Sequence, residues 1–293
     1  MPLSPQELHD ASPEELQARL LQLFLSPNYR PPVLPKVAIE LTDLTRRPNA
    51  SYDDVVLVLQ KDPFIVANVM RVAQSPLYAG RVRLQSLKDA VQRVGTSGLR
   101  DIVWQVAAGM RLFRAPGFTE ILERVQQHSL FMAYATRMVA SRAGIAAEHA
   151  FLCGLLHDVG ISGTLIALAE TENDVPIMSV LDGIDGMHQQ AGRVIVQHWG
   201  LSPDIGAAIE HHHGFDPNRT DVPLLTAVVC VAEQLAAKLN REIMDAQTNT
   251  HPHFDRHAPG RYLLALKRLR LEGKEAELYT RGEEIVERLQ ALV

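Results

Sequence analysis

The sequence predicts an all-α fold from two observations. Apolar residues recur at helical period along almost the whole 293-residue chain, and the few β-branched runs (VVLVL, RVIVQ, AVVCV) lie inside longer windows whose polar residues keep helical spacing. Helix start signals also precede several of these segments. With 46% hydrophobic residues, the chain can bury a substantial core as one large domain or two modest ones.

Start signals locate the helices of the first half. Ser51 and Ser86 are each followed three residues later by an aspartate, which is the spacing of a capping box, and Asp62-Pro63 offers an N-cap with a first-turn proline. The helices expected here span residues 36–46, 52–60, 63–73, 87–94 and 98–113.

The second half continues at helical period, and Ser202-Pro203 marks a further helix start. The helices expected here span residues 119–143, 147–157, 187–198, 204–212 and 223–239. Gly160 and the following Ser162-Gly163 indicate the end of a helix. Residues 240–260 are polar and irregular and are expected to form a loop, after which two charged closing helices occupy residues 261–293 with a break at Gly273.

Composition narrows the class of protein. A net charge of -5 and a pI near 6.2 provide no general attraction to phosphate backbones, so nucleic acid is not expected as a partner. Cys153 and Cys230 both lie in apolar runs, which is typical of reduced thiols and favours a cytoplasmic location. We expect no apolar stretch of the ~20 residues that a membrane span requires, and the N-terminus lacks a secretory signal pattern.

A group of polar residues stands out between the apolar segments. The pair His157-Asp158 closes the run FLCGLLHDVG, where burial would be costly unless the two side chains are paired or bound to metal. Side chains that could converge on this pair come from different predicted helices: His128, His188, the triplet His211 to His213, and Glu233. Such ligands suit a mono- or dinuclear site for iron, manganese, zinc or magnesium, in which one carboxylate can bridge two ions.

Each of these residues also has a simpler interpretation. His157-Asp158 alone could be a hydrogen-bonded pair at a helix end, and Glu233 alone is expected as a solvated helix position. The histidine triplet could be an exposed helix end. Cys153, Trp104 and Trp199 are expected to pack in the core. The remaining histidines have no partner pattern and are expected at the surface or in loops: His149, His198, His251, His253 and His257.

The order H, HD, H, HH and a late acid resembles the HD-domain superfamily of metal-dependent phosphohydrolases. A narrower resemblance is to the HDOD family, from about residue 29 to residue 238, through LPKVAIELTDLTRRPNASYDDVVLVLQKDPF, LKDAVQRVGTSGLRDIV, LLHDVG, HQQAGRVIVQHWGLSPDIGAAIEHHH and PLLTAVVCVAEQLA. This resemblance implies an HD-domain-like helical bundle with an N-terminal helical subdomain. The domains expected are an N-terminal helical extension (1–28), an HDOD domain (29–239, with halves 29–117 and 118–239), and a loop with C-terminal helices (240–293).

The resemblance also implies a set of metal ligands. They are His128 as the first histidine, His157 and Asp158 as the HD pair, His188, the paired His212 and His213 with His211 as a register alternative, and Glu233 as the late acid. Two departures stand out: Ile161 occupies the position where many active relatives carry a phosphate-binding lysine, and Glu233 replaces the usual aspartate. The segment HHHGFDPNR also lacks the glutamate and the GYP triplet of the cyclic-dinucleotide phosphodiesterase subclass.

The family resemblance implies a bacterial signal-transduction protein, a ligand- or partner-binding output module whose metal site is vestigial or intact. A signalling protein or a small phosphorylated ligand is the expected partner, and the charged C-terminal helices could form a homodimer contact. The alternative is a metal-dependent phosphohydrolase acting on a nucleotide or phosphoester, in which a metal-bound water attacks phosphorus.

Overall fold

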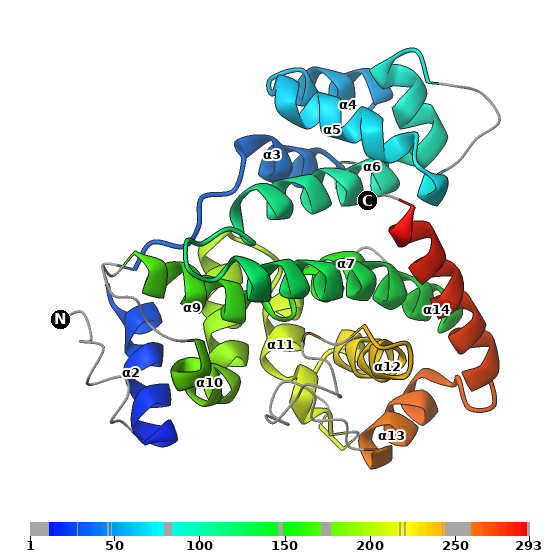
Figure 1. Ribbon diagram of the computed structural model, residues 1–293. Helices are drawn as coiled ribbons and strands as arrows, with labels where there is room; N and C mark the ends of the chain where they lie inside the picture. Colours follow the sequence, from blue (N-terminus) through cyan, green and yellow to red (C-terminus); the bar gives the residue numbers. More distant parts are fainter. Residues whose placement is uncertain are drawn as a thin grey trace. The chain divides into compact units, whose positions relative to one another are not determined.

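A computed structural model describes residues 12–27, 29–45, 47, 49–78, 84–145, 149–170, 177–216, 218–219, 221–241, 243 and 259–291. All regular elements within these residues are helices, which confirms the all-α prediction (Figure 1). Contacts divide the chain into two compact units. The larger unit contains Met1–Pro32 and Leu112–Gly282, and the smaller unit contains Val33–Arg111 and Glu283–Val293.

The smaller unit is a bundle of short helices. Its elements are α3 (Lys36–Thr45), α4 (Tyr52–Leu59), α5 (Pro63–Ala73), the 3₁₀ turn η1 (Pro76–Tyr78) and α6 (Leu87–Arg111). Helix α6 packs against α3, α4 and α5. The capping box at Ser51, the reciprocal bonds of Ser86 with Asp89, and the Asp62 cap are all present, so the start signals were correct.

Helix α6 is interrupted at Gly95. This residue has φ 71° and ψ 170°, which are not helical values. Glycine adopts a positive φ without the steric penalty of a Cβ. The two helices predicted on either side of residues 95–97 are therefore confirmed as two segments that meet at a kink.

Trp104 on α6 lies in the core of the smaller unit with none of its surface exposed. Its indole Nε1–H donates to Thr42 Oγ1 at 2.7 Å, and the Thr42 hydroxyl in turn donates to the Ala38 carbonyl at 2.9 Å. A buried indole N–H requires such an acceptor, because an unsatisfied donor destabilises the fold. This chain of hydrogen bonds joins α6 to α3.

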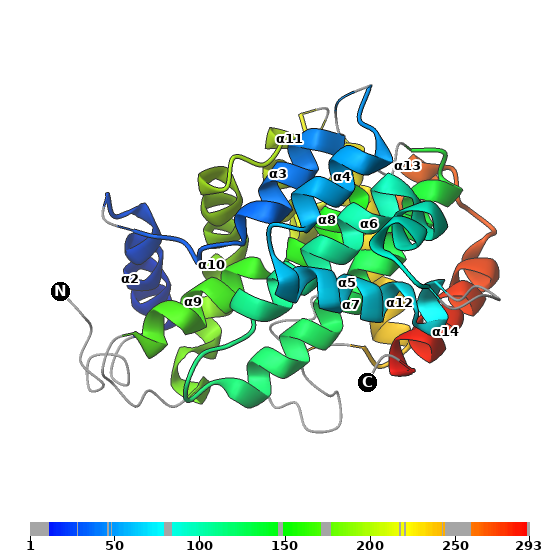
Figure 2. The same ribbon diagram turned by 90° about the horizontal axis from the view of Figure 1, so that it is seen from above.

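The larger unit contains the remaining helices. They are α2 (Pro13–Leu25), α7 (Thr119–Arg142), α8 (Ala150–Leu156), α9 (Val159–Ala169), α10 (Ile177–His198), α11 (Pro203–Glu210), η2 (His212–Gly214), α12 (Leu224–Lys238), α13 (Pro259–Leu269) and α14 (Glu275–Gln290), the last of which continues into the smaller unit. Helix α7 packs against α8 and α12, α10 packs against α9, α11 and α2, and α13 packs against α12 (Figures 1 and 2).

Two helix boundaries in this unit were predicted wrongly. Helix α9 runs through Gly160 and Gly163, where the sequence was expected to end a helix, and α10 begins at Ile177 instead of residue 187. The glycines allow close contact between helices: a Cβ on Gly160 would lie 1.9 Å from the His188 carbonyl oxygen, and one on Gly163 would lie 2.4 Å from Ile195 Cδ1. Glycine here indicates tight packing and not a helix end.

Within the described residues, one helical stretch, Ala150–Ala169, is long and apolar enough to cross a bilayer by length and composition, with a mean hydropathy of 1.7. The expectation that no stretch would reach this length was therefore wrong. However, 89% of the apolar window is buried inside the protein, and the polar pair His157-Asp158 separates α8 from α9 within it. Burial in the core accounts for its apolar composition.

Replacing Thr42 with valine should lower the free energy of unfolding by about 1–3 kcal/mol, because the buried Trp104 N–H loses its acceptor. Urea unfolding followed by tryptophan fluorescence measures this change. Thr45→Val is the matched control: Thr45 is only half-buried and its hydroxyl donates to the Thr42 carbonyl, so we expect a change within about 0.5 kcal/mol. Equal effects of the two substitutions would contradict the role assigned to the Thr42 hydroxyl.

Candidate metal centre

The larger unit brings all the sequence-predicted site residues together. Six of them are buried, with exposed fractions of 7% or less, and His213 is half-buried. They come from α7 (His128), the turn between α8 and α9 (His157 and Asp158), α10 (His188), η2 (His212 and His213) and α12 (Glu233). The register alternative, His211, belongs to neither group of converging ligand atoms, and its Nε2 lies 3.5 Å from Glu210 Oε2.

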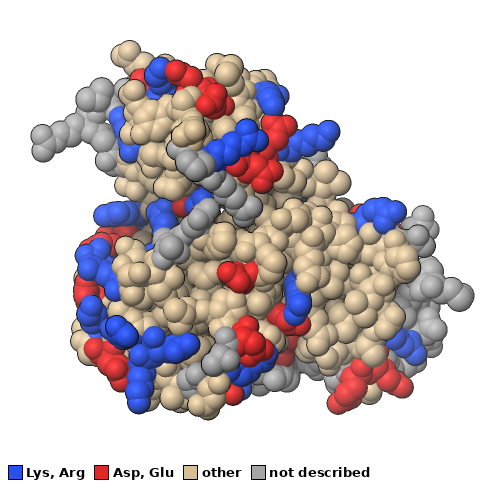
Figure 3. Space-filling view, turned by 180° about the vertical axis from the view of Figure 1, so that it is seen from behind, with Lys and Arg blue, Asp and Glu red and all other residues tan. Residues whose placement is uncertain are grey.

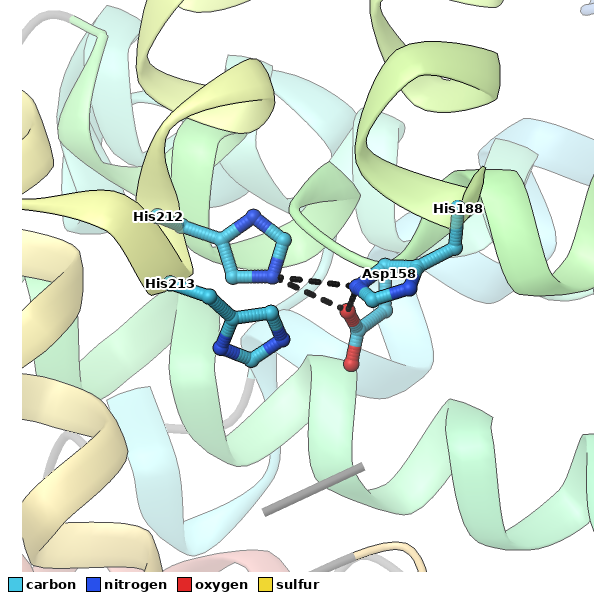
Figure 4. A group of neighbouring side chains, drawn as sticks. All are labelled: Asp158, His188, His212 and His213. Atoms are coloured by element: carbon cyan, nitrogen blue, oxygen red, sulfur yellow. Dashed lines mark hydrogen bonds and ion pairs between the residues drawn. The ribbon is translucent and has the colours of Figure 1, made fainter. Parts of the chain in front are cut away.

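The Asp158 carboxylate is shared by the two sides of the cluster, and Figure 4 shows it with His188, His212 and His213. Its Oδ1 lies 3.4 Å from His212 Nε2 and 3.6 Å from His188 Nε2. Its Oδ2 lies 3.0 Å from His157 Nε2 and 3.7 Å from His128 Nε2. Each carboxylate oxygen therefore faces a different pair of imidazoles, which is an arrangement suited to a carboxylate that bridges two cations.

Potential ligand atoms form two groups that share Asp158. In one group they belong to Asp158, His188, His212 and His213, and in the other to His128, His157 and Asp158; within each group they lie within 4.8 Å of one another. In Figure 4, the rings of the first group converge on the carboxylate from α10 and η2.

Glu233 lies on the side of the cluster that His128 and His157 form. Its Oε1 lies 2.9 Å from His157 Nε2 and 3.8 Å from His128 Nε2. The expectation that Glu233 would be a solvated helix position was wrong, because it is only 7% exposed. Its position follows from the packing of α12 against α7, which places this residue next to His128.

Backbone carbonyls orient three of the imidazole rings. Nδ1 of His157 bonds to the Gly154 carbonyl at 2.8 Å, and Nδ1 of His188 and of His212 bond to the carbonyls three residues earlier at 2.8 and 2.6 Å. A carbonyl oxygen can only accept, so Nδ1 carries the proton in each ring. In the neutral ring, Nε2 then presents a lone pair to the centre, as a metal ligand must.

His128 is oriented by a segment that sequence reasoning missed. Its Nδ1 donates to the Arg241 carbonyl at 2.6 Å, beyond the C-terminus of α12. Asn240 there has φ 52°, and the amides of Asn240 and Arg241 donate to the carbonyls of Ala237 and Ala236 at 3.2 and 2.8 Å. This is a Schellman motif with asparagine in the left-handed position. Asn240 directly after the apolar run of α12 was the available sequence signal.

The donor set fits a cation. Nε2 of His128 lies 3.1 Å from Nε2 of His157, and Nε2 of His188 lies 3.4 Å from Nε2 of His212. Because each of these rings donates through Nδ1, two neutral rings would direct lone pairs at each other. Asp158 Oδ1 and His213 Nε2 are also buried without a hydrogen-bond partner among the described residues. A proton or a divalent cation between these atoms relieves the repulsion and satisfies the unpaired atoms.

Without a cation, the acids around His128 and His157 favour protonation of these two rings. Burial alone would lower the pKa of His128, but the hydrogen bond and charge of Glu233 outweigh it and raise the pKa. Burial also opposes protonation of His157, whose pKa is nevertheless raised well above its usual range by Asp158 and Glu233. Although burial would raise the pKa values of Asp158 and Glu233, the histidines hold both well below their usual range.

On the other side of the cluster, His188 and His213 favour the neutral form. Burial, only partly offset by the charge of Asp158, lowers the pKa of His188 to about 4. Burial and the neighbouring His212 and His188 hold the pKa of His213 well below its usual range. At neutral pH the lone pairs of His188 and His213 are therefore available to a cation without the loss of a proton.

Substituting Gly160 with alanine should damage both the fold and the centre. The added Cβ would meet the His188 carbonyl carbon at 2.7 Å and the Gly192 amide nitrogen at 2.8 Å, so α9 and α10 must separate. We expect the free energy of unfolding to fall by about 1–3 kcal/mol and the metal affinity to decrease. Gly206→Ala on α11, where nothing lies nearer than 3.7 Å, should be neutral or slightly stabilising. Thermal unfolding and metal titration of both variants check this, and a fully stable Gly160→Ala protein would show that the contact is not tight.

Metal uptake by chelator-treated protein should release protons at neutral pH. The raised pKa values of His128 and His157 favour protonation of these rings, and a cation must displace the protons that they carry. Metal affinity should therefore rise with pH. Titration calorimetry with Mn²⁺ at about pH 6 and about pH 8, each in two buffers of different ionisation enthalpy, measures both quantities. An affinity that falls with rising pH would contradict the assigned protonation.

Comparisons with known proteins agree with this fold. The HDOD domain model matches residues 32–215. A Shewanella amazonensis structure provisionally described as a metal-dependent phosphohydrolase aligns with a TM-score of 0.67 at 20% identity, covering 93% of this chain and 98% of that one. An HDOD domain protein with unknown function from Geobacter sulfurreducens aligns with a TM-score of 0.63 at 21% identity, covering 93% and 99%.

Curated relatives are longer than this chain. An uncharacterized protein of Treponema pallidum is 25% identical over 222 residues, which is 72% of this chain and 43% of that protein. Ribonuclease Y of Deinococcus radiodurans is 28% identical over 153 residues, which is 52% of this chain and 22% of that protein. The chain thus spans less than half the length of these relatives, while the HDOD model covers more than half of the chain. The chain belongs to the HDOD family.

Proposed function

We propose that this chain is a regulatory HDOD protein that holds a divalent metal at Asp158 and binds a small phosphorylated ligand or a signalling partner at that centre. One observation carries the proposal: each oxygen of a buried carboxylate faces its own pair of imidazoles, and Oδ1 has no hydrogen-bond partner among the described residues. A buried, unpaired carboxylate oxygen is destabilising unless a cation or a hydrogen bond satisfies it.

The candidate ligands form two sets, one on each oxygen of the Asp158 carboxylate. His188, His212 and His213 would hold a cation with Asp158 Oδ1, and His128, His157 and Glu233 would hold one with Oδ2. Mixed imidazole and carboxylate donors suit iron, manganese or zinc, with magnesium favoured only where oxygen donors dominate. A bound divalent ion would supply Lewis acidity toward a phosphoryl oxygen. The Nδ1–H bonds to carbonyls fix the rings in advance.

The surroundings favour binding over hydrolysis. Ile161, at the position of the lysine found in many active relatives, is 1% exposed, and the whole stretch Ala150–Ala169 contains no lysine or arginine. A cation is therefore missing from the helices that carry the HD pair, where it would stabilise charge developing on a phosphoryl group. The second candidate remains a phosphohydrolase acting on a nucleotide or phosphoester, and the nearly complete ligand set and the similarity to ribonuclease Y favour it.

The binding partners and the cellular location of this chain are also proposals. Lysine and arginine are interspersed with aspartate and glutamate on the face shown in Figure 3, so the described residues of that face form no extended basic surface of the type that attracts nucleic acid. Cys153 and Cys230 are both free thiols, which supports a reducing, cytoplasmic location. A homodimer through the charged C-terminal helices is a further proposal.

Protein purified without chelator should contain divalent metal, and Asp158→Ala should lose it, with affinity lowered by at least about 100-fold. Elemental analysis by mass spectrometry measures the metal. Asp53→Asn, which changes an exposed carboxylate in the smaller unit, is the matched control and should retain full metal content. Absence of metal from the wild-type protein under these conditions would refute the proposal. Turnover of a phosphoester panel that disappears with Asp158→Ala would favour the hydrolase.

A further inference from the structure

We infer that the metal centre opens to ligands between η2, α12 and α13, and that Arg261 on α13 is the cation that receives a phosphate group of the ligand there. This inference rests on the proposed function, because it assigns a ligand class and a binding residue to the same centre.

Burial of the surrounding residues indicates where the centre opens. The candidate ligands on α7, α10 and the α8–α9 turn are at most 4% exposed. The partly exposed groups lie together elsewhere: His213 on η2 and Cys230 on α12 are half-buried, and Arg261 is exposed. Cys230 lies one helical turn before Glu233, so it borders the second group of ligands. Among the described residues, the most exposed groups around the centre are therefore at this edge, which is why the opening is assigned to it.

Arg261 lies at this edge by two separate observations. Its Nη1 donates to the His213 carbonyl, which ties α13 to the residue that carries a candidate ligand ring. Its charge also acts on the Cys230 thiol: burial and the charge of Glu233 raise the pKa of Cys230 to about 12, and the charge of Arg261 opposes the rise. The guanidinium therefore contacts the His213 backbone, and its charge is felt at Cys230.

The Arg261 guanidinium has N–H donors that no acceptor among the described residues uses. Arginine carries five N–H donors in a planar fork that matches phosphate, and the His213 carbonyl takes only one of them. Arg261 forms no ion pair with any carboxylate of the described residues. It is also in the first turn of α13 (Pro259–Leu269), where the helix dipole adds to the attraction for an anion. A ligand phosphate at this edge would meet a cation that no acid of the described residues competes for.

Arg261 also supplies a positive charge near the centre, which the helices that carry the HD pair lack. A cation near the centre is expected for any phosphorylated ligand, yet Ala150–Ala169 provides none. Arg261 lies outside the matched family region, residues 32–215, so a charge from the C-terminal segment takes the place of the missing lysine. The simpler role for Arg261 is to hold η2 in place through the His213 carbonyl, and the following experiment separates the two roles.

The test uses the full chain loaded with Mn²⁺ and inorganic phosphate as the probe. Paramagnetic broadening of the phosphate ³¹P signal reports approach to the centre, and its concentration dependence gives the dissociation constant. We expect Arg261→Gln to weaken phosphate binding by about 10-fold to 100-fold, the loss of a charge-assisted bidentate contact. Arg261→Lys should bind with intermediate affinity, because it keeps the charge without the planar fork. Arg268→Gln, another exposed cation of α13, should change nothing.

The outcomes distinguish a phosphate-binding role of Arg261 from a purely structural role. Unchanged Mn²⁺ content with weakened phosphate binding in Arg261→Gln supports the inference. Unchanged phosphate binding in that variant overturns the inference while the metal proposal stands. Loss of Mn²⁺ from Arg261→Gln also overturns it, since Arg261 would then act only by holding His213. Failure of the wild-type chain to retain Mn²⁺ would refute the proposed function and this inference together.

Discussion

The larger unit is organised around the burial of one carboxylate, Asp158, between two pairs of imidazoles. An acid and imidazoles in an apolar interior destabilise a fold unless their charges and lone pairs are matched. Here α7, the turn between α8 and α9, α10 and η2 each bring one imidazole to Asp158. The two sides differ in charge. Glu233 favours protons on His128 and His157, while desolvation keeps His188 and His213 neutral. The pocket is thus electrostatically asymmetric around a shared ligand.

Much of this arrangement was predictable from sequence, because it depends on local signals. The capping residues Ser51 and Asp62 fixed helix starts, since a side-chain oxygen that accepts from the first turn acts within three residues. The histidines and Asp158 were found because a polar pair inside an apolar run has few alternatives to a shared pocket. Their convergence from separate helices agreed with the family resemblance.

The errors arose where tertiary packing overrides local preference. Gly160 and Gly163 are helix breakers by propensity, yet they lie inside α9 because the neighbouring helix α10 comes too close for a Cβ. Glu233 taken alone was expected in solvent, because one acid in an amphipathic helix gives no sign of which face is buried, and only the family resemblance placed it among the ligands. The roles of Arg241 and Arg261 depend on a main-chain carbonyl and a long-range contact, which have no periodic signature. The expected loop 240–260 lies largely outside the described residues, as do His251, His253 and His257, whereas the extension 1–28 is described from residue 12 to residue 27 and contains α2.

The Schellman motif after α12 has a consequence for where this domain ends. The family match stops at residue 215, yet the carbonyl that accepts the His128 proton belongs to Arg241, and Glu233 also lies beyond the match. A fragment cut at the family boundary would keep the HD pair but leave His128 free to rotate and remove the acid beside it. The segment that builds the candidate centre is therefore longer than the segment that the family model matches, and it extends at least to Arg241.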